Sequence, residues 1–238
     1  MCVINKSVIF LFFMFVFLTP PAISGDEIWT EKKLGKLILK ADRAALQKRW
    51  HRAIKYGDKI LDGAEALNQH SDARYINLLK NVNKYYDKAG RLRDIPSRIK
   101  NGYILSNRYL GPSHATSITS RNLYYKLLIA NKNYSEAIPL INENTSILTS
   151  SREDRFRKLH YLEQLVHLYG LTRKYEKEEK TLLSLIDLNK KLFGKSDEGH
   201  TNAILMLAEN YCRQQKMAEF AELISQNNLK YYCKYYVK

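Results

Sequence analysis

Apolar residues recur at helical spacing in two neighbouring runs between positions 122 and 141. This stretch reads NLYYKLLIANKNYSEAIPLI, in which a first apolar run ends at a polar break and a second begins at Tyr134. Apolar residues at positions i, i+3, i+4 and i+7 are typical of an amphipathic helix. Because the break is too short for anything but antiparallel neighbours, the stretch predicts a pair of antiparallel helices.

The same arrangement recurs along the chain at a nearly constant step of 42, 42, 41 and 42 residues. Each copy contains a short segment that opens on a large apolar residue, and the five segments are Trp50–Ala53, Leu92–Ile95, Tyr134–Ala137, Tyr175–Glu178 and Met217–Phe220. Six residues before each segment stand Ala44, Tyr86, Leu128, Tyr169 and Tyr211, and three positions earlier again stand Ala41, Asn83, Tyr125, Val166 and Ala208. Self-similarity at a fixed period is the signature of stacked repeat units. The pattern therefore predicts five helix pairs.

Glycine and proline mark the links between pairs. The segments YLGPSHAT (109–116) and LFGKSDEGHT (192–201) resemble each other, with Gly111 and Gly194 at positions where helix C-caps favour glycine. Second helices that begin at the five segments would contain Pro96 and Pro139, and Pro139 should cost a backbone hydrogen bond or bend its helix. The expected units are roughly 29–70, 71–110, 114–150, 153–194 and 199–238.

Paired helices with a large residue, a small residue and Tyr on the first helix, then Tyr-x-Glu-Ala on the second, resemble tetratricopeptide repeats. The period of about 42 residues is similar to the longer variety found in kinesin light chains. The resemblance covers nearly all of 25–238, although Leu92 and Ile95 depart from Tyr and Ala, and Gly57 and Gly63 are poor helix residues. It implies an all-α fold, a right-handed α-solenoid of stacked antiparallel helix pairs.

The resemblance also implies that ligands lie in the concave groove, on the first helix of each unit. Lysines and amides that face one groove would recognise a carboxylate or an acidic segment through charge-assisted hydrogen bonds. In a different reading, the same residues are ordinary solvated polar positions. The candidate groove residues are Asn77, Lys80, Lys84, Asn122, Lys126, His160, Glu163, His167 and Asn202.

The first 24 residues have a separate pattern. Ser7 to Leu18 is an uncharged apolar run that follows Lys6, and the small residues Ala22 and Ser24 precede Gly25. This layout is typical of a secretory signal peptide, and the run is shorter than the roughly 20 residues of a membrane-spanning helix. The sequence predicts export to the periplasm or the medium, with an uncleaved anchor as the alternative.

Cysteine usage agrees with export. Cys2 lies in the predicted signal peptide, so the mature chain retains only Cys212 and Cys233. An exported protein with two cysteines can form one disulfide. The alternative is two unpaired thiols.

The chain is basic, with 39 Lys and Arg against 24 Asp and Glu. Removal of the signal peptide takes away only Lys6, which leaves 38 basic residues and a net charge of +14. A basic balance indicates anionic partners, and export favours acidic proteins, anionic polymers or lipid head groups over nucleic acid. The C-terminal stretch NLKYYCKYYVK is expected to form a final capping helix, with a membrane-interface segment or a polymer contact as alternatives.

No catalytic pattern is evident. The sequence has no glycine-rich phosphate loop and no Gly-x-Ser-x-Gly elbow, and we expect neither catalysis nor a cofactor. His160 and His167 stand two helical turns apart, roughly 10 Å, which is far for one ion, so no metal is expected.

The leading hypothesis is an exported scaffold that binds a protein or peptide partner in its groove. The alternative is a basic envelope-associated protein that binds anionic polymers or lipids through its net charge. The sequence does not indicate an oligomeric state.

Overall fold

The computed structural model describes residues 28–69 and 72–233, and this part of the chain folds into ten α-helices and one short 3-10 helix. It contains no strand, so the predicted all-α class is confirmed. The helices are α1 (Glu31–Leu46), α2 (Trp50–Ala66), α3 (Ala73–Lys88), α4 (Pro96–Leu110), α5 (Ala115–Ala130), α6 (Tyr134–Ser146), α7 (Arg152–Leu171), α8 (Tyr175–Phe193), α9 (Glu198–Arg213) and α10 (Met217–Gln226), and η1 (Leu92–Asp94) is the 3-10 helix. The predicted signal peptide, residues 1–24, lies outside the described residues.

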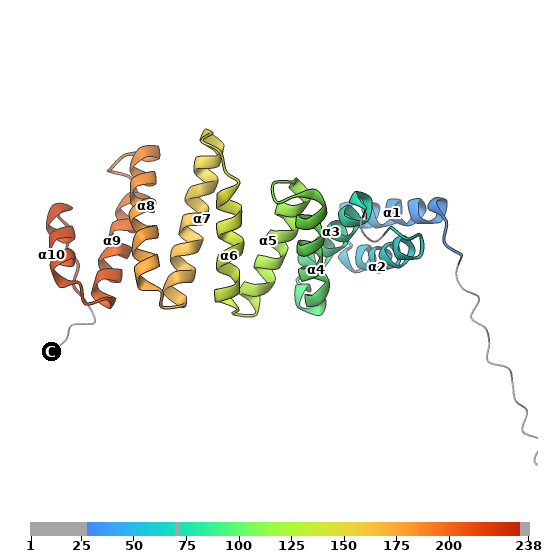
Figure 1. Ribbon diagram of the computed structural model, residues 1–238, viewed down its shortest axis with the longest axis horizontal. Coiled ribbons are helices and arrows are strands. Elements are labelled where there is room, and N and C mark those ends of the chain that lie inside the picture. Colours follow the sequence, from blue (N-terminus) through green and yellow to red (C-terminus); the bar gives the residue numbers. More distant parts are fainter. Residues whose placement is uncertain (1–27, 70–71, 234–238) are drawn as a thin grey trace, which may run out of the picture.

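The helices stack in chain order as antiparallel neighbours. Each helix packs on the next, and α3 also packs on α5. Figure 1 shows α1 and α10 at opposite ends of the long axis, with α1 and α2 turned across the direction of α7 and α8. The stack therefore rotates along its length, as expected of an α-solenoid.

The turn inside each pair has one residue with left-handed backbone. These residues recur at the spacing of the sequence repeat and have φ between 55° and 71°. The N–H of the following residue bonds to a carbonyl five positions earlier, as Arg49 does to Ala44 at 2.8 Å, which is the Schellman helix ending. The left-handed residues are Lys48, Gly90, Lys132, Arg173 and Gln215.

The core runs along the axis of the stack. One buried cluster extends from α1 to α7, a second joins α7, α8 and α9, and a third joins α9 to α10. Small residues at the repeating positions are nearly inaccessible: Ala53 and Ala137 are 0% exposed and Ala41 is 1% exposed. Small side chains let paired helices approach closely, so these positions fix the geometry of each pair.

Two glycines that weaken the sequence pattern of α2 have a packing role. A Cβ on Gly57 would lie 2.9 Å from a methyl of Val82 in α3. A Cβ on Gly63 would collide with the ring of Trp29, which precedes α1. Both glycines lower the helix propensity of α2 but allow close contact with a neighbouring side chain. The first unit forms a helix pair despite its irregular sequence.

The structure corrects one expectation about proline and confirms another. The second helix of the second unit was expected to begin at Leu92 and contain Pro96, but Leu92–Asp94 forms η1 and Pro96 is the first residue of α4. Proline is favoured there because its missing N–H has no partner at a helix start. Pro139 does lie inside α6, on an exposed position.

The prediction of a capping helix at the C-terminus is wrong for the described residues. The last helix, α10, ends at Gln226, and 229–233 is not helical. This segment instead returns to the stack: the ring of Tyr231 lies 6.3 Å from that of Phe220, and Cys233 pairs with Cys212 of α9 with their Cα atoms 5.7 Å apart. Tyr235 and Tyr236 lie outside the described residues.

We expect Cys212 and Cys233 to be bridged, because this Cα separation lies within the usual range for a disulfide. The mass of the non-reduced protein should be lower than that of the reduced protein by the hydrogens lost on oxidation. Alkylation of both cysteines without prior reduction would contradict the bridge.

A buried cation joins the second and third units. Arg121 of α5 is 0% exposed, and its guanidinium donates to Glu143 at 2.8 Å and to Asn144 at 2.6 Å in α6. It also donates to the carbonyl of Pro112 at 2.9 Å and to Asn107 of α4 at 3.2 Å. One side chain therefore links α4, the loop before α5, and α6.

Arg121→Ala should destabilise the protein by about 3–5 kcal/mol, because it leaves the carboxylate of Glu143 without its cation and the side-chain oxygen of the buried Asn144 without its donor. Urea unfolding followed by the helical circular dichroism signal measures the change. Arg157→Ala is the control, since Arg157 forms an exposed pair with Glu153 and should cost less than about 1 kcal/mol. Equal losses in the two variants would contradict the role assigned to Arg121.

Candidate functional site

Two of the predicted groove residues, Asn77 of α3 and Lys126 of α5, contact the other of these two helices. Asn77 of α3 accepts a hydrogen bond from Thr116 of α5 at 2.6 Å. Lys126 of α5 forms an ion pair with Asp87 of α3 at 2.8 Å, with the lysine side chain 55% exposed. The structure thus brings residues from two units onto one surface.

Two lysines on α3 influence each other. Burial lowers the pKa of Lys80, and the charge of Lys84, one helical turn away, lowers it further. Lys84 is exposed. Their shared face concentrates positive charge, and an anion bound there would relieve the repulsion between them.

A hollow of about 520 Å³ opens between α1 and α3 beside Lys84. One wall is apolar and includes Leu46, which is 86% exposed, and the half-buried Trp50. The opposite wall is basic and comes from α3. The lining residues are Asp42, Ala45, Leu46, Trp50, Asn81, Lys84, Tyr85 and Lys88.

Two residues that line this hollow, one from α1 and one from α3, are joined by a hydrogen bond. The hydroxyl of Tyr85 donates to a carboxylate oxygen of Asp42 at 3.1 Å. Burial raises the pKa of Tyr85, and the negative charge of Asp42 raises it further. The phenol therefore stays protonated near neutral pH and keeps donating to Asp42.

Sequence reasoning singled out Lys84 here but missed Asn81 and Lys88. They stand three residues before and four residues after Lys84, so helical spacing from Lys84 could have indicated a shared face. Leu46 and Asp42 gave no such signal, because their place opposite α3 depends on how the first two units stack.

The remaining predicted residues are not gathered into this site. Asn122 accepts a hydrogen bond from the buried Asn144 of α6 at 3.0 Å. His160, Glu163 and His167 of α7 and Asn202 of α9 are exposed. His160 contacts Gln164 at 2.9 Å within its own helix. Across 28–69 and 72–233, no group of three or more His, Cys, Asp or Glu side chains is placed to hold a metal ion.

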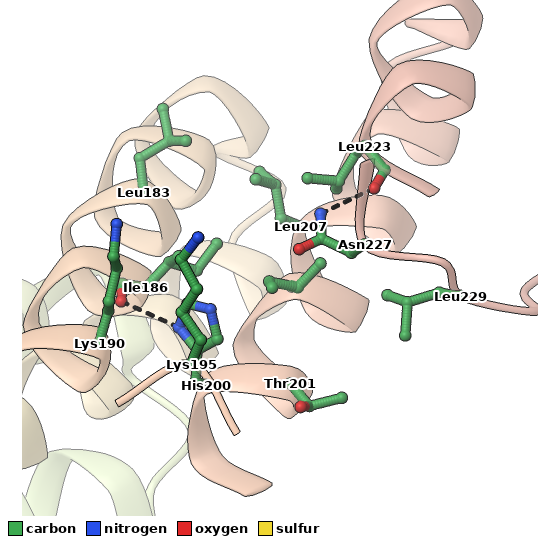
Figure 2. A pocket seen from close by; sticks show the side chains of 11 residues that line it. Leu183, Ile186, Lys190, Lys195, His200, Thr201, Leu207, Leu223, Asn227 and Leu229 are labelled. Carbon is green, nitrogen blue, oxygen red and sulfur yellow. Dashed lines mark hydrogen bonds between the residues drawn. The ribbon is translucent and has the colours of Figure 1, made fainter. Parts of the chain in front are cut away.

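A second hollow, of about 310 Å³, lies between α8, α9 and α10 (Figure 2). Its aliphatic lining includes Leu183 and Leu223, and Lys190 and Lys195 lie on one side near the buried His200. The sequence did not single out this hollow, because its residues come from three helices and two loops.

No protein-family model matches the chain, and no curated protein matches it. Two solved structures of a Podosopora anserina putative kinesin light chain with nearly identical TPR-like repeats, one of them a variant, are similar with a TM-score of 0.58. Sequence identity is 14%, and the matches cover 85% and 84% of this chain and 96% of the other. At this identity the likeness concerns the fold, which is that of a tetratricopeptide-like repeat.

The described residues include no helix that is long and apolar enough to cross a bilayer.

Proposed function

We propose that this protein is an exported, non-catalytic scaffold that binds an acidic segment of a protein partner across α1, α3 and α5. The observation that carries the proposal is the hollow between α1 and α3, where an apolar wall faces two lysines. The TPR-like fold supports it, since such stacks present extended concave surfaces for binding.

The chemistry of the hollow defines the segment that fits. An aliphatic or aromatic side chain would be buried against Leu46 and Trp50, and burial of a leucine-sized group contributes about 1.5–3 kcal/mol. Carboxylates next to that side chain would accept charge-assisted hydrogen bonds from Lys84 and Lys88. The expected ligand is a peptide with one apolar residue flanked by Asp or Glu.

Lys126 extends this basic surface onto α5. It is paired with Asp87, and a carboxylate of the partner would compete for the same ammonium group. Because the pair is largely exposed on the lysine side, its net contribution to stability is below about 1 kcal/mol. Replacement of the Asp87 carboxylate by a carboxylate of the partner at Lys126 therefore costs little free energy.

The groove is tested with a fluorescent peptide in which one leucine is flanked by glutamates. Lys84→Glu with Lys126→Glu should abolish binding, measured by anisotropy, because attraction to the peptide becomes repulsion. Asp87→Asn should strengthen binding, since it releases Lys126. Replacement of the leucine by serine in the peptide should weaken binding through loss of the apolar contact.

The matched control is Lys100→Glu with Lys158→Glu, which changes net charge equally at exposed positions of α4 and α7. If this control weakens binding as much as the groove variant, the peptide is captured by net charge and the site is wrong. Salt sharpens the comparison, because about 0.5 M salt screens simple charge attraction while leaving an apolar contact in place.

We further propose that residues 1–24 direct export and are then removed. The charge-free run and the small residues before Gly25 support this reading. Protein purified from its native host should have the mass of a chain that begins at Gly25. A mass that includes the first 24 residues would instead indicate an anchor that is retained.

A further inference from the structure

A small basic hollow lies at the turn that joins α1 to α2, apart from the groove residues Lys84 and Lys126. Its volume is about 190 Å³. The last turn of α1 and the first turns of α2 supply its lining, which combines four cations with an amide and a phenol. The lining residues are Lys40, Arg43, Ala44, Gln47, Arg49, Arg52 and Tyr56.

The arginines of this hollow lack counter-ions within the described chain. Arg43, Arg49 and Arg52 form no ion pair and no side-chain hydrogen bond with any described residue, and Lys40 lies 6.0 Å from the centre of the Tyr56 ring. All three arginines are exposed, whereas the half-buried Arg98 pairs with Asp58 at 2.9 Å and the buried Arg121 pairs with Glu143 at 2.8 Å. Their guanidinium groups are therefore available to an external anion.

One cation of this hollow, Arg52, lies where the fold would favour a negative charge, in the first turn of α2, whereas Arg43 lies in the last turn of α1, where a cation is favoured. The N-terminus of a helix carries partial positive charge and is stabilised by acidic side chains. The first turn of α2 has no acidic residue, and Arg49 provides no side-chain cap. At the position of Arg52, the second helices of the third and fifth units have Glu136 and Glu219 in their first turns, whereas the fourth unit has Lys177.

The placement of Arg52 favours a binding role. Local choices that oppose the stability of an element, without a compensating contact in the fold, are concentrated at functional sites. An anion in the hollow would neutralise the arginines, which have no counter-ion among the described residues.

We propose that this hollow binds a phosphate group. Each guanidinium presents a planar fork that matches phosphate oxygens two at a time, and three arginines offer more donors than the two oxygens of a carboxylate can accept. A phosphate monoester carries up to two charges and three free oxygens at neutral pH, which suits three guanidinium groups and one ammonium group.

Two sources could present this group, a lipid head group or a soluble phosphate. Leu39 and Leu46 of α1 are 69% and 86% exposed and stand seven residues apart, which places them on one face with Arg43 between them along the helix. Exposed leucines beside a phosphate site suit a membrane surface, where they would enter the interface. The lipid arm of the test is therefore expected to give the stronger binding.

The experiment uses the mature protein with inorganic phosphate, followed by calorimetry, and with vesicles, followed by flotation. One set of vesicles is phosphatidylcholine alone and the other contains phosphatidic acid, whose head group is a phosphate monoester. Arg43→Gln with Arg52→Gln should reduce affinity for both phosphate probes by about tenfold or more, because each lost charge-assisted bond contributes strongly. Lys100→Gln with Lys158→Gln is the control of equal charge and should bind as the unchanged protein does.

Loss of phosphate affinity in the arginine variant, but not in the lysine control, supports the site. If the unchanged protein binds inorganic phosphate but not the vesicles, the ligand of the site is a soluble phosphate. Equal loss in both variants overturns the proposal in favour of net charge, and absence of binding to either probe by the unchanged protein also overturns it. The arginine variant should unfold at about the same temperature, because Arg52 is removed from the first turn of α2, where a cation is unfavourable, and Arg43 from the last turn of α1, where a cation is favourable. It should still bind the acidic peptide in the groove, so failure of this site and of the groove can be distinguished.

Discussion

A helix pair in this chain has more apolar surface than its own two helices can cover, and that constraint shapes the molecule. Each pair buries its remaining face on the next pair, so the core extends along the axis from α1 to α10 instead of closing around a centre. Stability then depends on the contacts between neighbours. An elongated stack of this kind exposes long surfaces, and both proposed binding sites lie on such surfaces.

Buried polar groups interrupt this apolar core at specific joints. Arg121 connects α4, α5 and α6, and Glu178 of α8 is buried next to Asn210 of α9, which donates to it at 3.0 Å. Burial raises the pKa of Glu178, while the hydrogen bond from Asn210 and the charge of Arg213 oppose that rise. Paired polar groups contribute little net stability when buried, yet they penalise any other alignment of the neighbouring helices. We infer that they select which faces of adjacent units meet.

Departures from the repeat are informative because the chain provides its own reference. Glu178 occupies the small-residue position held by Ala137 in the third unit, and Gly170 of α7 leaves room for it, since a Cβ there would lie 3.0 Å from the carboxylate. Here the departure is compensated within the fold. Arg52 departs from Glu136 and Glu219 of the third and fifth units and has no such compensation, which is why we assign it a ligand.

The sequence by itself determined the all-α class, the pairing of helices and the glycine-based helix ends at Gly111 and Gly194, both of which have positive φ. These features follow from local periodicity and backbone preference, which depend only on residues that are close together in the sequence. It also predicted Lys84 and Lys126 as groove residues that bind a partner, and this assignment stays a prediction. It failed at Pro96, where a proline at a helix start was read as one inside a helix, and at 229–233, where the chain returns to α9 without forming a helix.

Only the tertiary structure decided that Leu46 faces Lys84 across a hollow, that Lys126 is paired with Asp87, and that three arginines surround one cavity. Those arrangements depend on how successive pairs rotate and stack, and that rotation is set by side-chain packing between residues far apart in the sequence.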